Sequence, residues 1–249
     1  MFLGTVLACM VGYLVGSFSF SIMVVRLKTN KDIRELGSKN AGATNASRVI
    51  GIKWGIFILF LDSLKVLFTV IIAMLINMIN SDLFNKTSFY IPILFTLIGH
   101  CWPIYYKFKG GKAVSCFLGL ILVTNFILFF AFIIFGLIIF FTFKKVSLAS
   151  MVASLLICIL MWVPQISGGS SFEINGFIFF SEVYSNNFYF VWFNKFHDLN
   201  HTNNFYDSFL TINIVLTIST LFLIYRHRAN LIRLFKKQEP NFIKSKKDK

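Results

Sequence analysis

The chain has 249 residues, of which 57% are hydrophobic, and a mean hydropathy of +0.74. Its apolar runs reach or approach the length of about 20 residues that a membrane-spanning helix needs, and they lie near 2–27, 53–79, 88–106, 112–142, 148–164 and 208–226. We therefore predict an all-α, polytopic integral membrane protein, with one membrane domain over 1–249 and no room for a soluble catalytic domain.

The net charge of +14 does not indicate nucleic-acid binding, because its distribution follows a membrane topology. All but three of the 24 Lys and Arg residues lie in four basic regions, 26–53, 107–112, 144–145 and 226–249. The positive-inside rule makes these regions cytoplasmic. The four cysteines form no CxxC pair and the four histidines lack metal-site spacing, so neither a disulfide framework nor a metal site is predicted.

The first segment is predicted to be a retained helix that starts outside the cell and ends at Arg26. It lacks the basic start and the cleavage site of a signal peptide. Its small residues, among them Gly12, Gly16, Ser17 and Ser19, indicate close packing against another helix.

A polar stretch follows at 32–48 and reads DIRELGSKNAGATNASR. It is far longer than a turn between two helices requires. Gly37 and Gly42 permit unusual backbone conformations, and the stretch supplies hydroxyls, amides and cations. Such groups are what a phosphate needs, although a solvated connecting loop would share this composition.

The second helix is predicted from about Lys53 to Asn80, with Asp62 and Lys65 on one face because they are three residues apart. Charges inside a membrane are costly, so this pair is either a structural ion pair or part of a site.

The third segment ends in GHCWPIYYKFKGGK, residues 99–112, where Pro103 marks a bend or the helix end. Gly110, Gly111 and Lys112 look like half of a phosphate-binding loop. They do not form a Walker A motif, because Ala113 stands where Ser or Thr should follow the Lys, so nucleotide hydrolysis is disfavoured.

Residues 112–142 are basic at both ends, so both ends should lie on the same side of the membrane. We predict two short helices, near 112–124 and 126–142, that meet near Asn125. One of them need not cross the membrane fully.

The next helix begins at VSLAS, residues 146–150, where Ser147 is a plausible N-cap and the helix start favours an anion. Residues 165–207 form a predicted external loop, and 208–226 return the chain to the cytoplasm. The basic tail runs from 227 to 249, and its last ten residues are predicted to be disordered and attracted to anionic lipid.

This reading gives seven apolar helices, an external N-terminus and a cytoplasmic C-terminus. Every candidate phosphate-binding motif lies on the cytoplasmic side, so the motifs are expected to form one site. Two alternatives remain at this point: a small-anion or phosphate transporter, and an assembly protein with a lipid-attracted tail.

With these motifs in view, the chain resembles the bacterial acyl-phosphate:glycerol-3-phosphate acyltransferase family (PlsY). The blocks that carry the resemblance are GSFSF at 16–20, DIRELGSKNAGATNASRVIG at 32–51, LDSLK at 61–65, GHCWPIYYKFKGGKA at 99–113, VSLAS at 146–150 and HRANLIRLF at 227–235. The resemblance implies a seven-helix bundle in the cell membrane with a cytoplasmic active site and neither metal nor cofactor. It also implies acyl transfer from acyl phosphate to the 1-position of glycerol 3-phosphate, giving lysophosphatidic acid and phosphate in the first acylation of phospholipid synthesis.

The resemblance implies that four residues bind phosphate groups: Ser38, Arg48, Lys112 and Ser147. The other residues implied to bind substrate or to shape the site are Gly37, Asn40, Gly42, Thr44, Asn45, Gly110, Gly111, His227 and Asn230. Asp62 and Lys65 would be structural support, His100 a hydrogen-bonded helix residue, and Lys107 and Lys109 either attractors of anionic substrate or ordinary topology signals. The implied partners are membrane lipid and other enzymes of phospholipid synthesis.

Acyl phosphate is already an activated mixed anhydride, so the site must hold two anions and align a hydroxyl with the carbonyl. No Asp lies five residues after any His, so the HxxxxD motif of other glycerophosphate acyltransferases is missing. This favours acyl phosphate, although a thioester donor stays open. The chain departs from the usual GGKGVAT with GGKAVSC, and its 165–207 loop is longer than the family suggests.

Overall fold

The computed structural model describes residues 3–163 and 209–242, and every regular element in these ranges is helical, which confirms the all-α prediction for them. The elements are α1 (Leu3–Ser17), α2 (Phe20–Thr29), the 3-10 turn η1 (Ile33–Glu35), α3 (Ala43–Ile50), α4 (Ile52–Asn77), α5 (Ile91–Cys101), the 3-10 turn η2 (Ile104–Tyr106), α6 (Val114–Thr124), α7 (Phe126–Phe143), α8 (Val146–Met161), α12 (Phe209–Arg226) and α13 (Arg228–Phe235). The predicted external loop at 165–207 lies outside the described residues.

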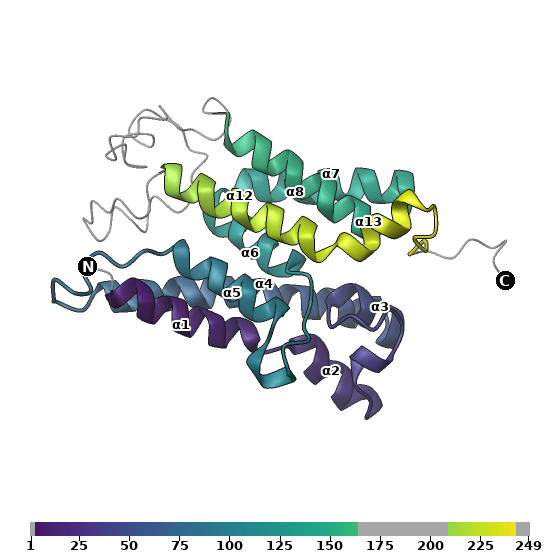
Figure 1. The fold of residues 1–249 in the computed structure, drawn as a ribbon, viewed down its shortest axis with the longest axis horizontal. Coiled ribbons are helices and arrows are strands. Elements are labelled where there is room, and N and C mark those ends of the chain that lie inside the picture. The colour runs from purple at the N-terminus through teal and green to yellow at the C-terminus, as the bar shows by residue number, and fades with distance from the viewer. Residues whose placement is uncertain (1–2, 164–208, 243–249) are drawn as a thin grey trace.

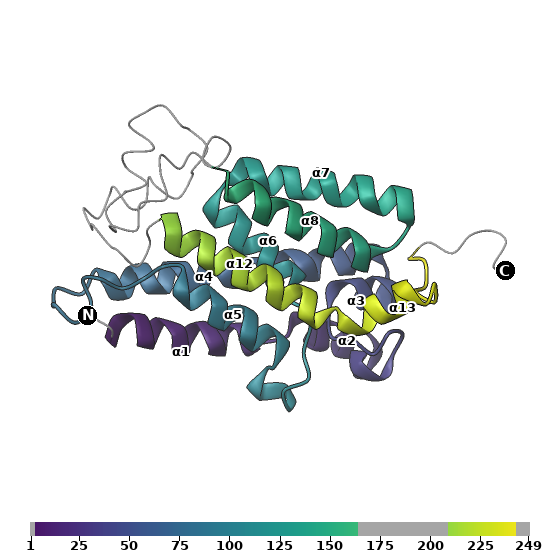
Figure 2. The ribbon, with the colours of Figure 1, turned by 45° about the horizontal axis from the view of Figure 1, so that its top comes forward.

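The long helices run side by side along one direction (Figure 1). The N-terminus and the connection between α4 and α5 lie at one end of the bundle, whereas α2, α3 and α13 gather at the other end (Figure 2). The polar motifs of the sequence are thus brought to one end, although they are far apart along the chain.

In the described ranges, three helical segments are long and apolar enough to cross a membrane: Leu3–Thr29, Ile52–Asn77 and Phe126–Phe143. A fourth is possible if α12 and α13, which meet at a bend of 58°, are counted as one span. The remaining apolar helices, α5, α6 and α8, are shorter. A helical membrane protein is confirmed by these segments and by the solved relatives reported below, whereas the count of seven spans stays a prediction.

The first apolar segment is broken into α1 and α2, so the prediction of one continuous helix ending at Arg26 is wrong. The break lies just before Ser19, whose Oγ accepts a hydrogen bond from the Ile22 N–H at 3.4 Å and caps α2. A serine hydroxyl competes with the backbone for hydrogen bonds, and here it starts a new helix instead of continuing the old one.

Close packing of α1 is confirmed. A side chain at Gly12 would lie 2.7 Å from the Pro92 carbonyl oxygen of α5, and one at Gly16 would collide with the backbone of Thr96. Gly99 of α5 lies equally close to the backbone of α1. Glycines on both faces let the two helix backbones approach without side chains between them.

Asp62 and Lys65 of α4 form a buried ion pair, and whether the pair also serves the site stays a prediction. Lys65 Nζ lies 2.6 Å from Asp62 Oδ1, and both side chains are buried. Lys65 also donates to the Gly16 carbonyl at 3.4 Å and lies over the Phe20 ring at 5.2 Å. The pair therefore ties α4 to the break between α1 and α2.

Two helices meet at Asn125, as predicted for 112–142. Asn125 ends α6 and begins α7, and its side chain accepts a hydrogen bond from the Leu128 N–H at 2.9 Å. The chain turns back there, so the connection between α7 and α8, which carries two lysines, returns to the end of the bundle that holds α3 and α13 (Figure 2).

Candidate functional site

A cavity of about 530 Å³ opens at the end of the bundle where α3, the start of α8 and α13 meet. Its lining consists of Ser38, Lys39, Asn40, Gly42, Ala43, Thr44, Asn45, Arg48, Leu59, His100, Lys112, Val114, Ser115, Val146, Ser147, Ser150, His227, Ala229, Asn230, Arg233, Glu239 and Pro240. Every site residue predicted from the sequence is among them except Gly37, Gly110 and Gly111. Motifs separated by up to about two hundred residues therefore share one cavity.

Asn45 organises the polar stretch that precedes α3. It is buried, and its Nδ2 donates to the carbonyls of Ile33, Leu36 and Asn40 at 2.9–3.1 Å. Its Oδ1 accepts the Ser38 N–H at 2.8 Å. Because these contacts occupy its amide, Asn45 shapes the loop and leaves Ser38 facing the cavity.

Gly37 lies behind this arrangement. Its φ of +54° falls in the left-handed region, and a side chain there would collide with Asn45 Oδ1. Only glycine meets both conditions without strain. Gly37 therefore supports the loop from outside the cavity, which explains why it does not line it.

α3 was missed by the sequence analysis, which treated 32–48 as an irregular loop. The helix begins after Gly42, which makes no side-chain cap, so the first N–H groups of α3 have no intrahelical partner at the cavity. Arg48 lies on the same helix. No carboxylate of the described residues pairs with Arg48, and its guanidinium lies 5.5 Å from the Phe242 ring. Free N–H groups and an unneutralised cation suit an anion.

The Gly110–Gly111 turn delivers Lys112 to the cavity. The turn lies against the end of α5, where the Gly110 N–H donates to the Cys101 carbonyl at 3.2 Å and the Gly111 N–H donates to the His100 carbonyl at 3.0 Å. A side chain on Gly111 would collide with His100 Nε2. Both glycines thus permit close packing of the turn and do not themselves face the cavity.

Lys112 is the best-positioned cation of the site. Its Nζ donates to Asn230 Oδ1 at 2.6 Å, across the cavity from α13. Burial lowers its pKa to about 8; nearby Glu239 opposes the shift, whereas neighbouring arginines add to it. A bound phosphate would bring further negative charge close to this ammonium group and raise its pKa again.

His227 lines the cavity and has one ring nitrogen, Nε2, that can accept a hydrogen bond. Its Nδ1 lies 2.9 Å from the Leu223 carbonyl oxygen, which only accepts hydrogen bonds, so Nδ1 carries the proton and Nε2 is free to accept one. Burial lowers the pKa of His227 to about 4, with a further lowering from Lys112, so the ring is neutral at physiological pH. A neutral acceptor at this point suits a hydroxyl group.

Glu239 is a site residue that the sequence analysis missed. Its Oε1 accepts hydrogen bonds from Ser147 Oγ at 2.7 Å and Asn230 Nδ2 at 2.6 Å, and its Oε2 accepts from Arg233 Nε at 2.7 Å. Burial raises its pKa, but these hydrogen bonds outweigh burial and lower the pKa overall. The available signal was that Glu239 is the single acidic residue between 226 and 247.

One prediction about this region is wrong, and a second fails at the few of its residues that the structure describes. Ser147 is not the N-cap of α8, because Lys145 holds that position and the Ser147 hydroxyl is donated to Glu239. The predicted disorder of the last ten residues does not hold at 240–242: the Phe242 N–H donates to the Lys144 carbonyl at 2.9 Å, and its ring lies 5.9 Å from that of Phe140. Residues 243–249 lie outside the described ranges, so the prediction stays a prediction for them.

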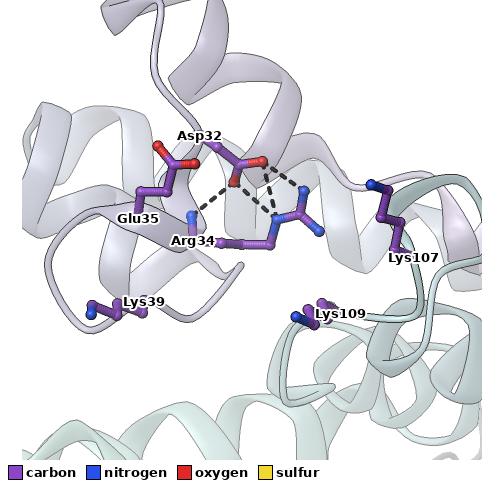
Figure 3. A pocket seen from close by; sticks show the side chains of 7 residues that line it. Asp32, Arg34, Glu35, Lys39, Lys107 and Lys109 are labelled. Atoms are coloured by element: carbon purple, nitrogen blue, oxygen red, sulfur yellow. Dashed lines mark hydrogen bonds and ion pairs between the residues drawn. The ribbon is translucent and has the colours of Figure 1, made fainter.

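A second, shallower hollow of about 340 Å³ adjoins the cavity and shares Lys39 with it (Figure 3). Asp32 binds the Arg34 guanidinium at 2.6–3.1 Å, and Arg34 also donates to the Tyr106 carbonyl at 2.7 Å. This contact lowers the pKa of Asp32 and joins two loops, so Arg34 is not a free cation for phosphate. Lys107 and Lys109, in contrast, have no carboxylate partner among the described residues.

The helical bundle and the cation-lined cavity define a membrane protein with a site suited to phosphate-bearing ligands. The chain fits the family model described as glycerol-3-phosphate acyltransferase over residues 6–237. It is 48% identical over 242 residues to the glycerol-3-phosphate acyltransferase of Mycoplasma mycoides subsp. mycoides SC, covering 96% of this chain and 93% of that one. It is 46% identical to the enzyme of the same name from Mycoplasma capricolum subsp. capricolum, covering 99% and 95%.

The fold is also that of a solved enzyme. A crystal structure of PlsY (YgiH), an integral membrane glycerol 3-phosphate acyltransferase, in its glycerol 3-phosphate form superposes with a TM-score of 0.69 at 26% identity over 96% of each chain. The chain belongs to the glycerol-3-phosphate acyltransferase family and is a membrane acyltransferase. The resemblance seen in the motifs is confirmed, and the transporter and assembly-protein alternatives are set aside.

Proposed function

We propose that this protein transfers a fatty acyl group from acyl phosphate to the 1-hydroxyl of glycerol 3-phosphate at the cytoplasmic face of the cell membrane. The observation that carries this proposal is the meeting of Arg48, Lys112 and the start of α3 around one cavity. The solved relative in its glycerol 3-phosphate form supports the acceptor. The products would be lysophosphatidic acid and inorganic phosphate.

Arg48 and Lys112 are proposed to hold the phosphate groups, with the N–H groups at the start of α3 and the Ser38 hydroxyl as further donors. These groups line the cavity without an internal carboxylate on either Arg48 or Lys112 within the described ranges. Two phosphates bring at least two negative charges together, and fixed cations and N–H groups lower that repulsion. They also stabilise the charge that develops on the carbonyl oxygen during transfer.

Ser147 reaches a phosphate by a different route. Its hydroxyl proton is already donated to Glu239. Its backbone N–H lies in the first turn of α8, has no intrahelical partner and is available to an anion.

His227 and Asn230 are proposed to orient glycerol 3-phosphate. The free Nε2 of His227 accepts a hydrogen bond from the 2-hydroxyl of glycerol 3-phosphate, which orients the acceptor and leaves the proton of the 1-hydroxyl free to pass to phosphate. His227 does not take up that proton, because its pKa of about 4 makes it a weak base. The hydroxyl proton passes to a substrate phosphate oxygen as the new ester bond forms and the acyl–phosphate bond breaks.

The acyl chain is proposed to lie where the cavity lining becomes apolar, at Leu59 of α4, Val114 of α6 and Val146 of α8. α4 and α8 expose apolar side chains on the surface of the bundle, whereas α6 is buried, so a chain placed there opens sideways into the membrane between α4 and α8. The seven-helix topology, with the N-terminus outside, the tail inside and one domain over 1–249, is proposed on the distribution of basic residues.

The test is acceptor-dependent release of inorganic phosphate by the purified protein in lipid, given palmitoyl phosphate and glycerol 3-phosphate. We expect Lys112→Ala and Arg48→Ala to lower kcat/KM by about 100-fold or more, as loss of a charge-stabilising group does. Lys86→Ala is the matched control, because this lysine belongs to the connection between α4 and α5, which lies at the opposite end of the bundle (Figure 1). Turnover with an acyl thioester but not with palmitoyl phosphate would overturn the proposed donor.

A further inference from the structure

Arg226 does not line the cavity but lies beside the Gly110–Gly111 turn, which carries Lys112 into it. It stands in the last turn of α12, immediately before His227. Its Nη2 donates to the Gly111 carbonyl at 2.9 Å, its Nε donates to the same oxygen at 3.3 Å, and Nη2 also reaches the Cys101 carbonyl at 3.5 Å. The guanidinium thus holds the glycine turn and the end of α5 together.

The surroundings of Arg226 are unusual for a half-buried cation. No carboxylate of the described residues pairs with it, and its guanidinium lies 4.9 Å from the Trp102 ring. Carbonyl oxygens and an aromatic face hold it in place. A planar guanidinium makes several such contacts at fixed angles, which an ammonium group cannot reproduce.

The contact also joins the two halves of the site. The turn on one side carries Lys112, and the chain on the other side carries His227 and then Asn230. Lys112 and Asn230 meet at 2.6 Å across the cavity. The distance between the turn and the α12–α13 corner is therefore fixed in two places: by Lys112 inside the cavity and by Arg226 behind it.

We infer that Arg226 is a positioning residue that clamps the Gly110–Gly111 turn to the α12–α13 corner and so sets the place of Lys112 relative to His227. The inference rests on the proposed function, because it assigns these two residues to the two substrates. Arg226 touches neither substrate. Its loss displaces one binding group relative to the other, so kcat falls more than KM rises.

Two variants separate the hydrogen bonds of Arg226 from its positive charge. Arg226→Lys keeps the charge but loses the forked guanidinium that contacts two carbonyls, whereas Arg226→Gln loses both the charge and the guanidinium. We expect both to lower kcat by about 10- to 100-fold, since a displacement near 1 Å has an effect of that size. Deprotonation of Lys112 should make kcat/KM fall at alkaline pH. Because Arg226 is one of the cations that lower the Lys112 pKa, this fall should keep its midpoint in Arg226→Lys and move to higher pH in Arg226→Gln. Arg228→Gln, an exposed arginine two residues away, is the control.

Hydrogen exchange provides a readout that needs no substrate. The Gly110 and Gly111 N–H groups are bonded to α5, so their exchange should speed up in both Arg226 variants but not in Arg228→Gln. Unchanged exchange at the turn, or kcat within twofold of wild type in Arg226→Lys, would overturn the inference. An inactive wild type with faster exchange in the variants would instead overturn the proposed donor and leave the clamp standing.

Discussion

The pKa of Lys112 leads to a sharp pH prediction. In the free enzyme this pKa is about 8, because burial disfavours the ammonium form. The group is therefore about nine-tenths protonated at pH 7 and about one-tenth protonated at pH 9. If only the charged form binds substrate phosphate, kcat/KM is nearly constant below pH 7 and falls about tenfold by pH 9. Bound phosphate raises the pKa, so kcat at saturation should hold to higher pH than kcat/KM does.

The substitution that tests this prediction is Lys112→Arg. A guanidinium stays charged throughout this range, so the alkaline limb should disappear even if the plateau is lower. Glycerol 3-phosphate does not affect the fall above pH 7, because the second ionisation of a phosphate monoester has a pKa near 6 and is about nine-tenths complete at pH 7. Lys109→Arg, a lysine outside the main cavity, is the control that should keep the wild-type limb.

The assay is initial-rate phosphate release from pH 6 to 10 in lipid, corrected at each pH for spontaneous hydrolysis of palmitoyl phosphate. A kcat/KM that stays flat to pH 9.5 in wild type would refute the reasoning. An unchanged limb in Lys112→Arg would show that another group titrates.

Three further predictions follow from the same region. Glu239→Gln leaves Arg233 without its carboxylate and should reduce the free energy of unfolding by about 1–3 kcal/mol, measured by thermal unfolding in detergent; an unchanged Tm would contradict this. Ala113→Gly should change stability by less than about 1 kcal/mol, because relief of the left-handed φ of 63° is offset by a lost buried methyl and added chain entropy. Lys107→Gln combined with Lys109→Gln should lower kcat/KM severalfold at low ionic strength and leave it unchanged near about 0.5 M salt, where surface charges are screened; equal losses at both salt concentrations would mean a direct contact.

The sequence predicts well where one physical requirement constrains a whole segment. Two helices meeting at Asn125 follow from basic residues at both ends of a run too long for one span. The Asp62–Lys65 pair follows from the cost of leaving charges alone in a membrane. In both cases the free-energy cost of placing charge in the membrane limits the structures that the segment can adopt.

The sequence predicts poorly where the partner is distant or the element is short. Glu239 and Ser147 are 92 residues apart, and neither carries a local sign of the other. α3 has eight residues and a polar composition, so it resembles a loop until its packing against α4 is known. The break before Ser19 was missed because serine is compatible with close packing inside a membrane helix as well as with a cap.

The short helices of the bundle determine how deep the reaction takes place. α5 and α6 have 11 residues each, which at the usual rise gives about 16 Å, roughly half of a hydrocarbon layer about 30 Å thick. In the proposed topology the other ends of α5 and α6 face the outer surface, so the glycine turn between them would lie below the inner headgroups. In the proposed reaction, glycerol 3-phosphate would descend through water to reach it, whereas the acyl phosphate, anchored in lipid by its chain, would arrive at that depth by lateral diffusion. The acylated product then remains in its leaflet from the moment it forms.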